Sequence, residues 1–287
     1  MIPPSFDYHR PQSLDEAIGL LQRLGEDARV VAGGHSLIPM MKLRLAQPDH
    51  LVDLRDLAEL RQLRSDGDTL IIGAMVTQHA VIGSDLLRQK CPILRETALQ
   101  IADPQVRYVG TIGGNVANGD PGNDMPAVMM ALNAGYRVKG PGGERDIPAR
   151  DFYQSTFVTA LKPGEILTSI RIPAPPAGHG AAYEKQKRKV GDYATAAAAV
   201  ILTVNQGACT SASVALTNVG GTAIFAAAAG QALVGTRLDA AAIAAASSQA
   251  ASVAQPAADQ HGPANFRKHV AGVMVGRAIQ RAKERAA

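Results

Sequence analysis

Two short stretches decide the fold expected for this chain: Ala32-Gly33-Gly34-His35-Ser36 and Thr111-Ile112-Gly113-Gly114-Asn115. Each has the pattern of a double-glycine turn beside a small hydroxyl or amide residue, between an expected strand and an expected helix. Glycine has no Cβ, so a ligand can come close to the backbone, and successive N–H groups can point into one concavity that holds an anion. Because the chain has two such turns, we expect them to converge on the diphosphate of one nucleotide cofactor.

The composition indicates an ordered globular protein with a mildly basic surface. The chain has 287 residues, of which 46% are hydrophobic, and a formal net charge of +4. This length suffices for two or three domains. The longest basic run, residues 185–189, contains no aromatic residue, so we expect no nucleic-acid partner.

The cysteine count and the hydropathy pattern limit the chemistry and the location. Cys91 and Cys209 are far apart in sequence, and by themselves they can hold neither a four-cysteine iron–sulfur cluster nor a structural zinc. We therefore expect no metal site in this chain. No secretory signal is visible, and no run of about 18 strongly apolar residues is present, so we expect a cytoplasmic protein without a transmembrane segment.

The local patterns divide the chain into three expected units. Residues 1–55 have the pattern of a small α/β unit, residues 56–176 form a second unit, and residues 177–287 have the α+β pattern of an antiparallel sheet with helices. The stretch 173–178, rich in Pro and Gly, is the clearest linker. The stretch 103–124 is expected to be one long loop, and loops of this length in compact domains are usually functional.

Hydrophobic periodicity and capping residues give the expected elements. The expected strands are 29–32, 51–54, 69–74, 136–139, 144–147, 165–172, 183–187, 194–204 and 208–218. The expected helices are 14–24, 36–45, 77–90, 92–101, 125–132, 222–232, 239–253 and 263–285, with Ser13, Ser36, Thr77 and either Asn123 or Asp124 as N-caps.

The better-known nucleotide signatures are absent. The chain has no G-x-x-x-x-G-K-[ST] loop and no G-x-G-x-x-G, which disfavours a P-loop NTPase and a two-layer dinucleotide fold. Instead, the two double-glycine stretches resemble the two FAD-pyrophosphate motifs of the flavoprotein subunits of molybdenum hydroxylases. The resemblance covers the whole chain, and the stretches 34–40, 112–124 and 187–196 are most similar to the medium subunits of aerobic carbon monoxide dehydrogenases.

The resemblance implies the fold class and the cofactor. The fold would be α+β, with a two-subdomain FAD-binding fold of the vanillyl-alcohol oxidase type at 1–55 and 56–176 and a C-terminal antiparallel sheet with helices at 177–287. FAD would bind non-covalently. His35 is expected to pack or hydrogen-bond locally, because a flavin needs no protein base to pass on electrons, and we expect no catalytic residue in this chain.

The resemblance also implies contacts with the tail of the cofactor. Residues 32–36 and 111–115 would supply backbone N–H groups to the pyrophosphate, and the hydroxyls of Ser36 and Thr111 would add donors. Asp124 would accept a hydrogen bond from a sugar hydroxyl of the cofactor. The alternative for Asp124 is a plain N-cap of the helix at 125–132, and both roles can hold at once.

Four further positions would surround the flavin ring. Ile101 is expected beside the isoalloxazine, with a core residue as the alternative. Leu167 and Lys185 are expected at the far wall, where Lys185 could offer a cation to a ring carbonyl or a phosphate; a surface lysine is the alternative. Tyr193 is expected to stack on the ring face, with a buried structural tyrosine as the alternative.

The resemblance implies partners that hold the other redox centres. A large subunit with the molybdenum cofactor would oxidise CO with water to CO2, and a small subunit would carry two [2Fe-2S] clusters, in a dimer of heterotrimers. FAD in this chain would pass the electrons to an external acceptor such as a quinone, which could place the complex at the inner face of the membrane. Three alternatives stay open: a standalone FAD-dependent oxidase of the same fold, the flavoprotein subunit of a related aldehyde or purine hydroxylase, and a scaffold that has lost its cofactor.

Overall fold

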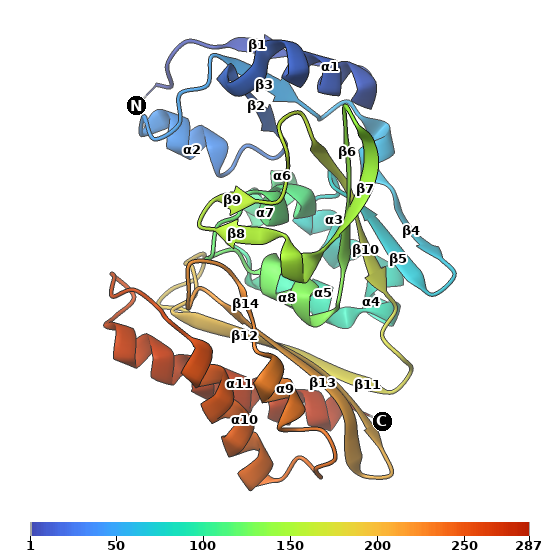
Figure 1. The fold of residues 1–287 in the computed structure, drawn as a ribbon, viewed down its shortest axis with the longest axis vertical. Helices are drawn as coiled ribbons and strands as arrows, with labels where there is room; N and C mark the ends of the chain where they lie inside the picture. The colour runs from blue at the N-terminus through green and yellow to red at the C-terminus, as the bar shows by residue number, and fades with distance from the viewer. Residues whose placement is uncertain (1, 287) are drawn as a thin grey trace.

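Three larger sheets follow one another along the chain. The structure is a computed structural model that describes residues 2–286. The strand orders are β1-β3-β2, β4-β5-β10-β6-β7 and β11-β12-β13-β14. Figure 1 shows these sheets one below another, from the N-terminal unit at the top to the C-terminal unit at the bottom. Within residues 2–286, none of the helices combines the length and the hydropathy needed to cross a lipid bilayer.

The N-terminal unit is a small parallel sheet with one helix on each face. Its elements are β1 (Asp7–His9), α1 (Leu14–Leu24), β2 (Ala28–Val31), α2 (Leu37–Lys42) and β3 (His50–Asp53), and both outer strands pair in parallel with β3. The apolar side of α1 packs with Val52, whereas Met41 of α2 packs with Val31 and Leu51 on the other face. The alternation of side chains along each strand therefore builds two small cores.

The N-terminal caps of these two helices differ. Ser13 caps α1 as predicted, because its Oγ accepts from the N–H of Glu16 at 3.2 Å. The carboxylate of Glu16 accepts from the N–H of Gln12. The predicted cap by Ser36 is wrong, since its side chain makes no capping hydrogen bond. The predicted end of α2 at residue 45 is also wrong: Arg44 has φ +62°, which a helix does not tolerate.

The middle unit is an antiparallel sheet covered by short helices. Its strands are β4 (Leu63–Asp66), β5 (Thr69–Gly73), β6 (Gly135–Gly140), β7 (Gly143–Pro148) and β10 (Ile166–Pro173), with the small hairpin β8 (Tyr153–Ser155) and β9 (Val158–Thr159) beside it. Its helices are α3 (Gln78–Gly83), α4 (Asp85–Lys90), α5 (Pro92–Gln100), α6 (Pro104–Val109), α7 (Ile112–Ala117) and α8 (Met125–Ala131).

Two expectations for the middle unit are wrong. The stretch 103–124 is not one loop, because it contains α6 and α7. Asp103 caps α6 by accepting from the N–H of Val106, and Thr111 caps α7 by accepting from the N–H of Gly114. The helix expected at 77–90 is two helices, because Ser84 ends α3 and caps α4 by accepting from Leu87. In each case a small polar residue supplies the local cap that starts a new turn.

The C-terminal unit is an antiparallel sheet with helices, as predicted. Its elements are β11 (His179–Gln186), β12 (Ala196–Asn205), β13 (Ala208–Thr217), β14 (Ile224–Phe225), α9 (Ala227–Gln231), α10 (Ala240–Val253) and α11 (Ala264–Arg285). The helix expected at 222–232 is shorter, since β14 takes its first residues. The turn between β12 and β13 consists of Gln206 and Gly207, both with positive φ, which suits a tight hairpin.

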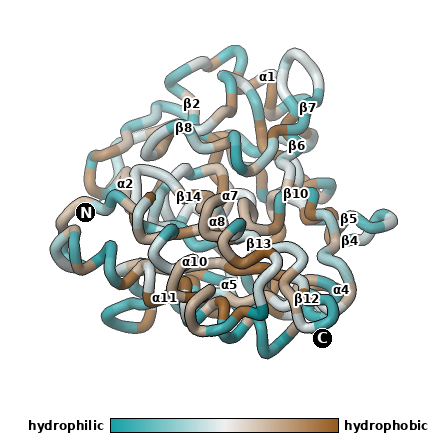
Figure 2. Tube along the Cα trace, turned by 60° about the horizontal axis from the view of Figure 1, so that its bottom comes forward, coloured by the Kyte–Doolittle hydropathy of each residue, from teal (hydrophilic) through white to brown (hydrophobic). Residues whose placement is uncertain are grey.

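The middle and C-terminal units share one hydrophobic core. All seven residues of α8 are buried, and α8 lies between the middle sheet and the face of the C-terminal sheet that carries Ala197, Ala199 and Ala215. Figure 2 shows the hydrophobic character of this helix. Ala196 and Ala198 point the other way, toward the core under α10 and α11. The alanine run is thus a strand buried on both faces, where small side chains allow close packing.

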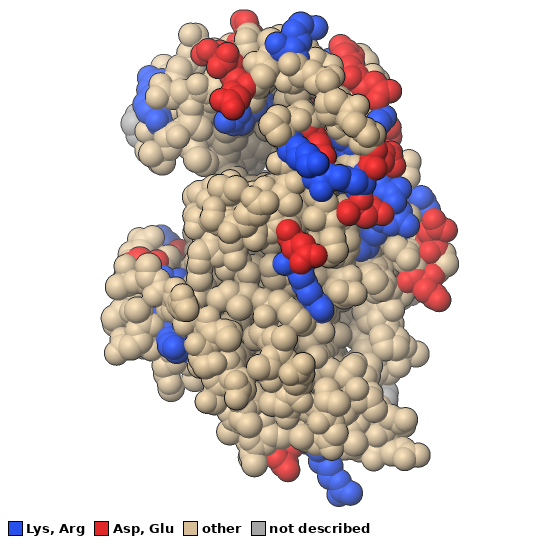
Figure 3. All heavy atoms as spheres, in the orientation of Figure 1, with Lys and Arg blue, Asp and Glu red and all other residues tan. Residues whose placement is uncertain are grey.

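Charged side chains are unevenly distributed over one face of the molecule. Figure 3 shows them gathered on the N-terminal unit and on the strands β6 and β7, where Arg137 pairs with Glu144 and Asp146. The same view shows a notch at the left between the N-terminal unit and the rest of the molecule. The ends of β2 and β3 and the segment before α7 border a pocket of about 190 Å³ in this region.

We predict that Gly180→Ala destabilises the C-terminal unit. A Cβ on Gly180 of β11 would overlap the backbone carbonyl of Ala282 in α11, and overpacking of this kind costs about 1–3 kcal/mol. Thermal unfolding should show a lowered melting temperature. Gly142→Ala is the control, because its Cβ would meet nothing within 4 Å. Equal melting temperatures for both variants would show that α11 is not seated on β11 in this way.

Candidate functional site

The two double-glycine stretches lie close together, as expected. A Cβ built on Gly33 would lie 2.6 Å from the carbonyl oxygen of Val109 and 2.7 Å from the Cα of Gly110. A Cβ on Gly114 would lie 3.7 Å from the Cβ of Ala32. The absence of a side chain at position 33 therefore lets the loop after β2 lie directly against the residues that precede α7.

The first stretch presents unused donors. Gly34 has φ +70°, a conformation that favours glycine. The N–H groups of Gly34, His35 and Ser36 donate to no acceptor within residues 2–286, and the Ser36 hydroxyl is also without a partner there. The His35 ring makes only a local contact, from Nδ1 to the carbonyl oxygen of Gly33 at 2.8 Å. This loop can therefore donate several hydrogen bonds to one anion.

The second stretch uses its backbone donors within the protein. The N–H groups of Ile112 and Gly113 donate to the carbonyl oxygens of Val76 and Ala74, each at 2.9 Å. Gly114 donates to Thr111 Oγ1 at 3.0 Å, and Asn115 donates to the Thr111 carbonyl. These four N–H groups lie in the first turn of α7, docked beside β5, and the expected contact of residues 111–115 with a pyrophosphate stays a prediction. The Thr111 hydroxyl hydrogen remains as a donor for a ligand.

Glycine at position 113 has a packing reason. A Cβ there would lie 2.5 Å from the Cβ of Ala74.

The side chain of Asn115 joins α7 to the start of α8, because its Oδ1 accepts from the N–H of Met125 at 3.2 Å. Asn123 strengthens this link by donating from Nδ2 to the Asn115 carbonyl at 2.7 Å. The second stretch thus fixes the position of Asp124, which lies between Asn123 and Met125 in the chain.

Asp124 and Lys185 form a buried ion pair. Lys185 Nζ lies 2.8 Å from Asp124 Oδ2, and the two side chains are only 1% and 5% exposed, respectively. Tyr183 donates from its hydroxyl to Asp124 Oδ1 at 2.6 Å. Burial, together with the charge of Asp124, holds the pKa of Tyr183 well above its usual value, so the phenol stays a donor. Asp124 therefore does not cap α8, and the alternative that Lys185 is a surface lysine is wrong.

The remaining predicted residues differ in exposure. Ile101 and Leu167 are buried in the core of the middle unit, so the core alternative for Ile101 holds. Tyr193 is 45% exposed, which contradicts the alternative of a buried structural tyrosine. Its ring lies over Gly122, where a Cβ would be 2.7 Å from Tyr193 Cδ1, and its hydroxyl donates to Asp120 at 3.2 Å.

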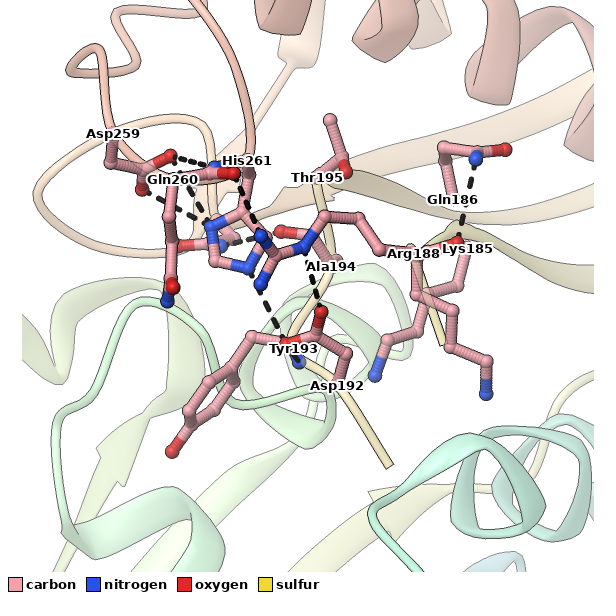
Figure 4. Close-up of polar contacts among 12 residues, drawn as sticks. Lys185, Gln186, Arg188, Asp192, Tyr193, Ala194, Thr195, Asp259, Gln260 and His261 are labelled. Carbon is pink, nitrogen blue, oxygen red and sulfur yellow. Dashed lines mark hydrogen bonds and ion pairs between the residues drawn. The ribbon is translucent and has the colours of Figure 1, made fainter. Parts of the chain in front are cut away.

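A polar cluster anchors the loop that carries Tyr193. Figure 4 shows His261 between the carboxylates of Asp192 and Asp259, with Nε2 3.6 Å from Asp192 Oδ1 and Nδ1 3.2 Å from Asp259 Oδ1. Arg188 pairs with Asp192 at 3.0 Å and donates to the Gln260 carbonyl at 2.9 Å. The loop between β11 and β12 is thereby tied to the segment between α10 and α11.

Sequence reasoning missed a second cluster beside the first double-glycine stretch. Asp53, at the end of β3, is fully buried, and its carboxylate accepts hydrogen bonds from the Tyr8 hydroxyl at 2.5 Å and from Arg55 Nε at 2.6 Å. The available signal was a carboxylate at the end of a strand that pairs in parallel with the strand before Gly33. The pocket of about 190 Å³ lies here.

No metal centre is evident in the part of the chain that the structure describes. Residues 2–286 contain no group of three or more His, Cys, Asp or Glu side chains placed to hold a metal ion. Cys91 and Cys209 are both buried and free. Burial raises the pKa of the Cys91 thiol to about 12, which makes it a poor nucleophile.

Comparison with known proteins covers the chain from end to end. The family described as "FAD binding domain in molybdopterin dehydrogenase" matches residues 4–175, and the family described as "CO dehydrogenase flavoprotein C-terminal domain" matches residues 181–282. The carbon monoxide dehydrogenase medium chain of Afipia carboxidovorans is 61% identical over 286 residues, which are 100% of this chain and 99% of the relative. The medium chain from Hydrogenophaga pseudoflava is 46% identical over the full length of both proteins. A solved chain of the reconstituted CO dehydrogenase from Oligotropha carboxidovorans has a TM-score of 0.99 at 62% identity, with complete coverage of both chains.

We predict that Lys185→Met destabilises the protein by leaving Asp124 buried without its cation. Removing one partner of a buried ion pair costs about 3–5 kcal/mol, and the remaining bond from Tyr183 places this case near the lower end. Thermal unfolding measures the loss. The double variant Asp124→Asn/Lys185→Met should recover part of it, because no charge is then left unpaired. A double variant as unstable as Lys185→Met would contradict the assignment.

We predict that His261→Leu loosens the loop 187–195. Hydrogen exchange of its amides should become faster, while amides of the parallel N-terminal sheet stay unchanged. His179→Leu is the control, because within residues 2–286 the only hydrogen bond of the His179 ring is in its own turn, with the Pro176 carbonyl. Unaltered exchange in the loop after removal of His261 would rule out the anchoring role.

We predict that protection of the same loop falls in acid. Burial acts to raise the pKa of Asp192, but the hydrogen bond from Arg188 and the neighbouring charges lower it overall below its usual value. The stabilisation is therefore present above the ordinary pKa of about 3.9 and is lost as the pH falls through the lowered value. Protection factors measured from pH 7 down to below pH 4 should decline, and a constant protection factor over this range would contradict the prediction.

Proposed function

The chain belongs to the family of FAD-binding medium subunits of carbon monoxide dehydrogenase, and from this premise we propose that it holds FAD in the notch between its N-terminal unit and the rest of the molecule. The family is that of an oxidoreductase within the molybdenum hydroxylases. The observation that carries the proposal is the set of free N–H donors at residues 34–36, which lies next to the contact of Gly33 with Val109 and Gly110.

The residues present fit the diphosphate of FAD. Three successive N–H groups at Gly34, His35 and Ser36 and one free hydroxyl face no protein acceptor within residues 2–286. Backbone donors of this kind normally find a partner when a site closes. Thr111 approaches from α7 with a hydroxyl hydrogen to donate, since its oxygen already accepts from Gly114. A dianionic linker would satisfy all of these groups together.

The other predicted residues would form the remainder of the site. In the proposal, Asp124 accepts from a sugar hydroxyl and Tyr193 lies against the flavin ring. Ile101 packs beside the isoalloxazine, and Leu167 and Lys185 form the far wall. Because Lys185 already neutralises Asp124, the pair presents no net charge to the cofactor. The ring of Tyr193 is held in place by the loop that the cluster around His261 anchors.

When bound, FAD would supply the redox chemistry, receiving electrons from iron–sulfur clusters of a partner subunit and releasing them to an external acceptor such as a quinone. The chain itself would bind the cofactor and fix its orientation. Its backbone donors fix the diphosphate, and its buried core excludes water from one side of the ring. The Tyr193 hydroxyl keeps its proton, because partial burial and the nearby carboxylate of Asp120 raise its pKa.

The proposed partners follow from the same family. The medium chain belongs to a complex with large and small subunits, and we infer that the large subunit carries the molybdenum cofactor, the small subunit carries the [2Fe-2S] clusters, and the complex is a dimer of heterotrimers. A cytoplasmic location at the inner face of the membrane belongs to this proposal. So does the division into FAD-binding subdomains 1–55 and 56–176 and a C-terminal domain 177–287.

Two other functions remain testable. A standalone oxidase would turn over small alcohols without partners, and a related aldehyde or purine hydroxylase subunit would assemble with a different large subunit. The full-length identity of 61% to a carbon monoxide dehydrogenase medium chain favours the proposed complex. Purification of the native complex, followed by assays of metals, flavin and CO oxidation, separates the three functions.

We predict that Ser36→Asp abolishes flavin binding in the assembled complex. The new carboxylate would lie beside the diphosphate, and like charges at a few ångströms repel by about 1–4 kcal/mol at effective dielectric constants between those of water and a protein surface. The variant should purify folded but without visible flavin absorbance. Ser248→Asp on the exposed face of α10 is the control and should retain flavin. A fully flavinated Ser36→Asp complex would contradict the assigned diphosphate site.

A further inference from the structure

The imidazole of His261 is buried between two carboxylates, and one of its ring nitrogens has no hydrogen bond. The ring sits on the tight turn 260–261, whose flanking residues pair through their backbones, and its side chain is only 5% exposed. Nδ1 lies 3.2 Å from Asp259 Oδ1. Nε2 is buried without a hydrogen-bond partner in residues 2–286 and lies 3.6 Å from Asp192 Oδ1, as Figure 4 shows.

We propose that His261 positions the loop 187–195 through its charge, by carrying a proton on each ring nitrogen, and that the loop loosens when Nε2 loses its proton. The position of Tyr193, which this loop carries, would then depend on pH. His261 acts within the chain itself, so this device can be tested without a cofactor and stands apart from the proposed function.

The surroundings of the ring favour two protons over one. A neutral imidazole donates on one side only. With its proton on Nδ1, the lone pair of Nε2 faces the carboxylate of Asp192, and with its proton on Nε2, the lone pair of Nδ1 faces Asp259. Two acceptors would then face each other away from water, which is unfavourable. The imidazolium donates to both carboxylates, and hydrogen bonds between charged groups are stronger than neutral ones.

Asp192 transmits the contact to the loop. Its Oδ1, which faces His261, also accepts from the backbone N–H of Tyr193 at 3.0 Å. The loop is closed at its base by the hydrogen bond from the N–H of Thr195 to the carbonyl oxygen of Gln186 at 2.7 Å. Release of Asp192 from His261 therefore acts on the backbone beside Tyr193, whereas the base of the loop stays closed.

Two arginines also face this cluster and oppose a further positive charge. Arg188 Nε lies 3.0 Å from Asp192 Oδ2, and Arg267 Nη1 lies 2.8 Å from Asp259 Oδ2. Both arginines bind Oδ2, which leaves Oδ1 of each carboxylate to the imidazole. The side chain of Arg188 is 44% exposed, so water and salt screen its charge. Protonation of His261 thus adds the missing donor at Asp192 Oδ1 and displaces neither arginine.

The stability of the loop should fall as the pH rises through the titration of histidine. The contribution of the imidazolium is present where the ring holds both protons and is lost when one proton leaves. Histidine is the side chain that changes charge between about pH 5 and pH 8. Loss of the Asp192 charge acts only in acid, below the ordinary carboxyl pKa of about 3.9. By reciprocity, a ligand or partner that fixes the loop promotes protonation of His261.

Hydrogen exchange of the flavin-free, full-length chain tests the pH dependence. Protection factors of the amides in 187–195 are compared at about pH 5.5 and about pH 8.5, on either side of the histidine range. They should fall about tenfold or more at the higher pH, the loss expected for one hydrogen bond between charged groups. His261→Gln should show weak protection that is equal at both pH values. His179→Gln is the control and should keep the dependence of the unmodified chain.

A single fluorophore reports on the tip of the loop. The chain has no tryptophan, and Val190 is 82% exposed, so Val190→Trp introduces one reporter without disturbing a core. Its fluorescence anisotropy should be lower at the higher pH, because the loop moves more freely. The difference should vanish in the double variant Val190→Trp/His261→Gln. Equal anisotropy and equal protection at both pH values in the otherwise unmodified chain would overturn the proposal.

Nitrogen-15 NMR of the imidazoles counts the protons directly. The signals of His261 are those lost in His261→Gln, and they should show both nitrogens protonated at the lower pH and one at the higher pH. A ring with one proton at both pH values would overturn the proposal, as would a folded His261→Gln variant with the pH dependence of the unmodified chain.

A second variant keeps the test decisive if His261→Gln fails to fold, which circular dichroism shows. Asp192→Asn retains an oxygen for the N–H of Tyr193 but removes the charge that faces Nε2. It should reduce the pH dependence of loop protection to less than half of its size in the unmodified chain. An undiminished dependence in folded Asp192→Asn would also overturn the proposal.

Discussion

The arrangement of the candidate site depends on the contact of Gly33 with the backbone of Val109 and Gly110. No side chain fits there, because even a Cβ would lie 2.6 Å from a carbonyl oxygen. The contact joins the loop after β2 to the segment that leads into α7, and it brings the carboxyl edge of the N-terminal sheet against the middle unit. The same contact brings the pocket at Asp53 and the loop with the free donors beside Val109.

The middle and C-terminal units are held together by a hydrophobic core that they share. Helix α8 is apolar all round and belongs to a core that both units contribute to. The ion pair of Asp124 and Lys185 crosses the same boundary, from the start of α8 to β11. Such a pair is costly to bury, and Tyr183 offsets part of this cost by donating to the carboxylate. The middle and C-terminal units therefore present one rigid wall, toward which the N-terminal unit offers its donors.

The sequence predicted the parts that depend on local patterns. Glycines without a Cβ, strand alternation and the cap at Ser13 each act within a few residues, so the two motifs, most strands and the long C-terminal helices could be located. Burial of Lys185 could not be predicted in this way, because it depends on a carboxylate 61 positions away in the chain. The two short helices in 103–124 were missed because their caps, Asp103 and Thr111, lie among loop-forming residues. The role of Asp53 depends on the pairing of three strands, and only the fold reveals it.

The two double-glycine stretches look alike in sequence, yet they do different physical work. In the first, positive φ at Gly34 opens the backbone and leaves its N–H groups unsatisfied. In the second, the missing Cβ at Gly113 lets α7 pack on Ala74, and the N–H groups are used by the protein. The first stretch therefore offers hydrogen-bond donors to a ligand, and the second stretch holds α7 in place against the middle unit. Because the donors belong to the N-terminal unit and the proposed surroundings of the ring belong to the other two, a bound cofactor would span the junction. A ligand that binds only when the N-terminal unit is docked on the other two units also stabilises that docking. The cofactor would therefore add to the stabilisation that the contact of Gly33 provides.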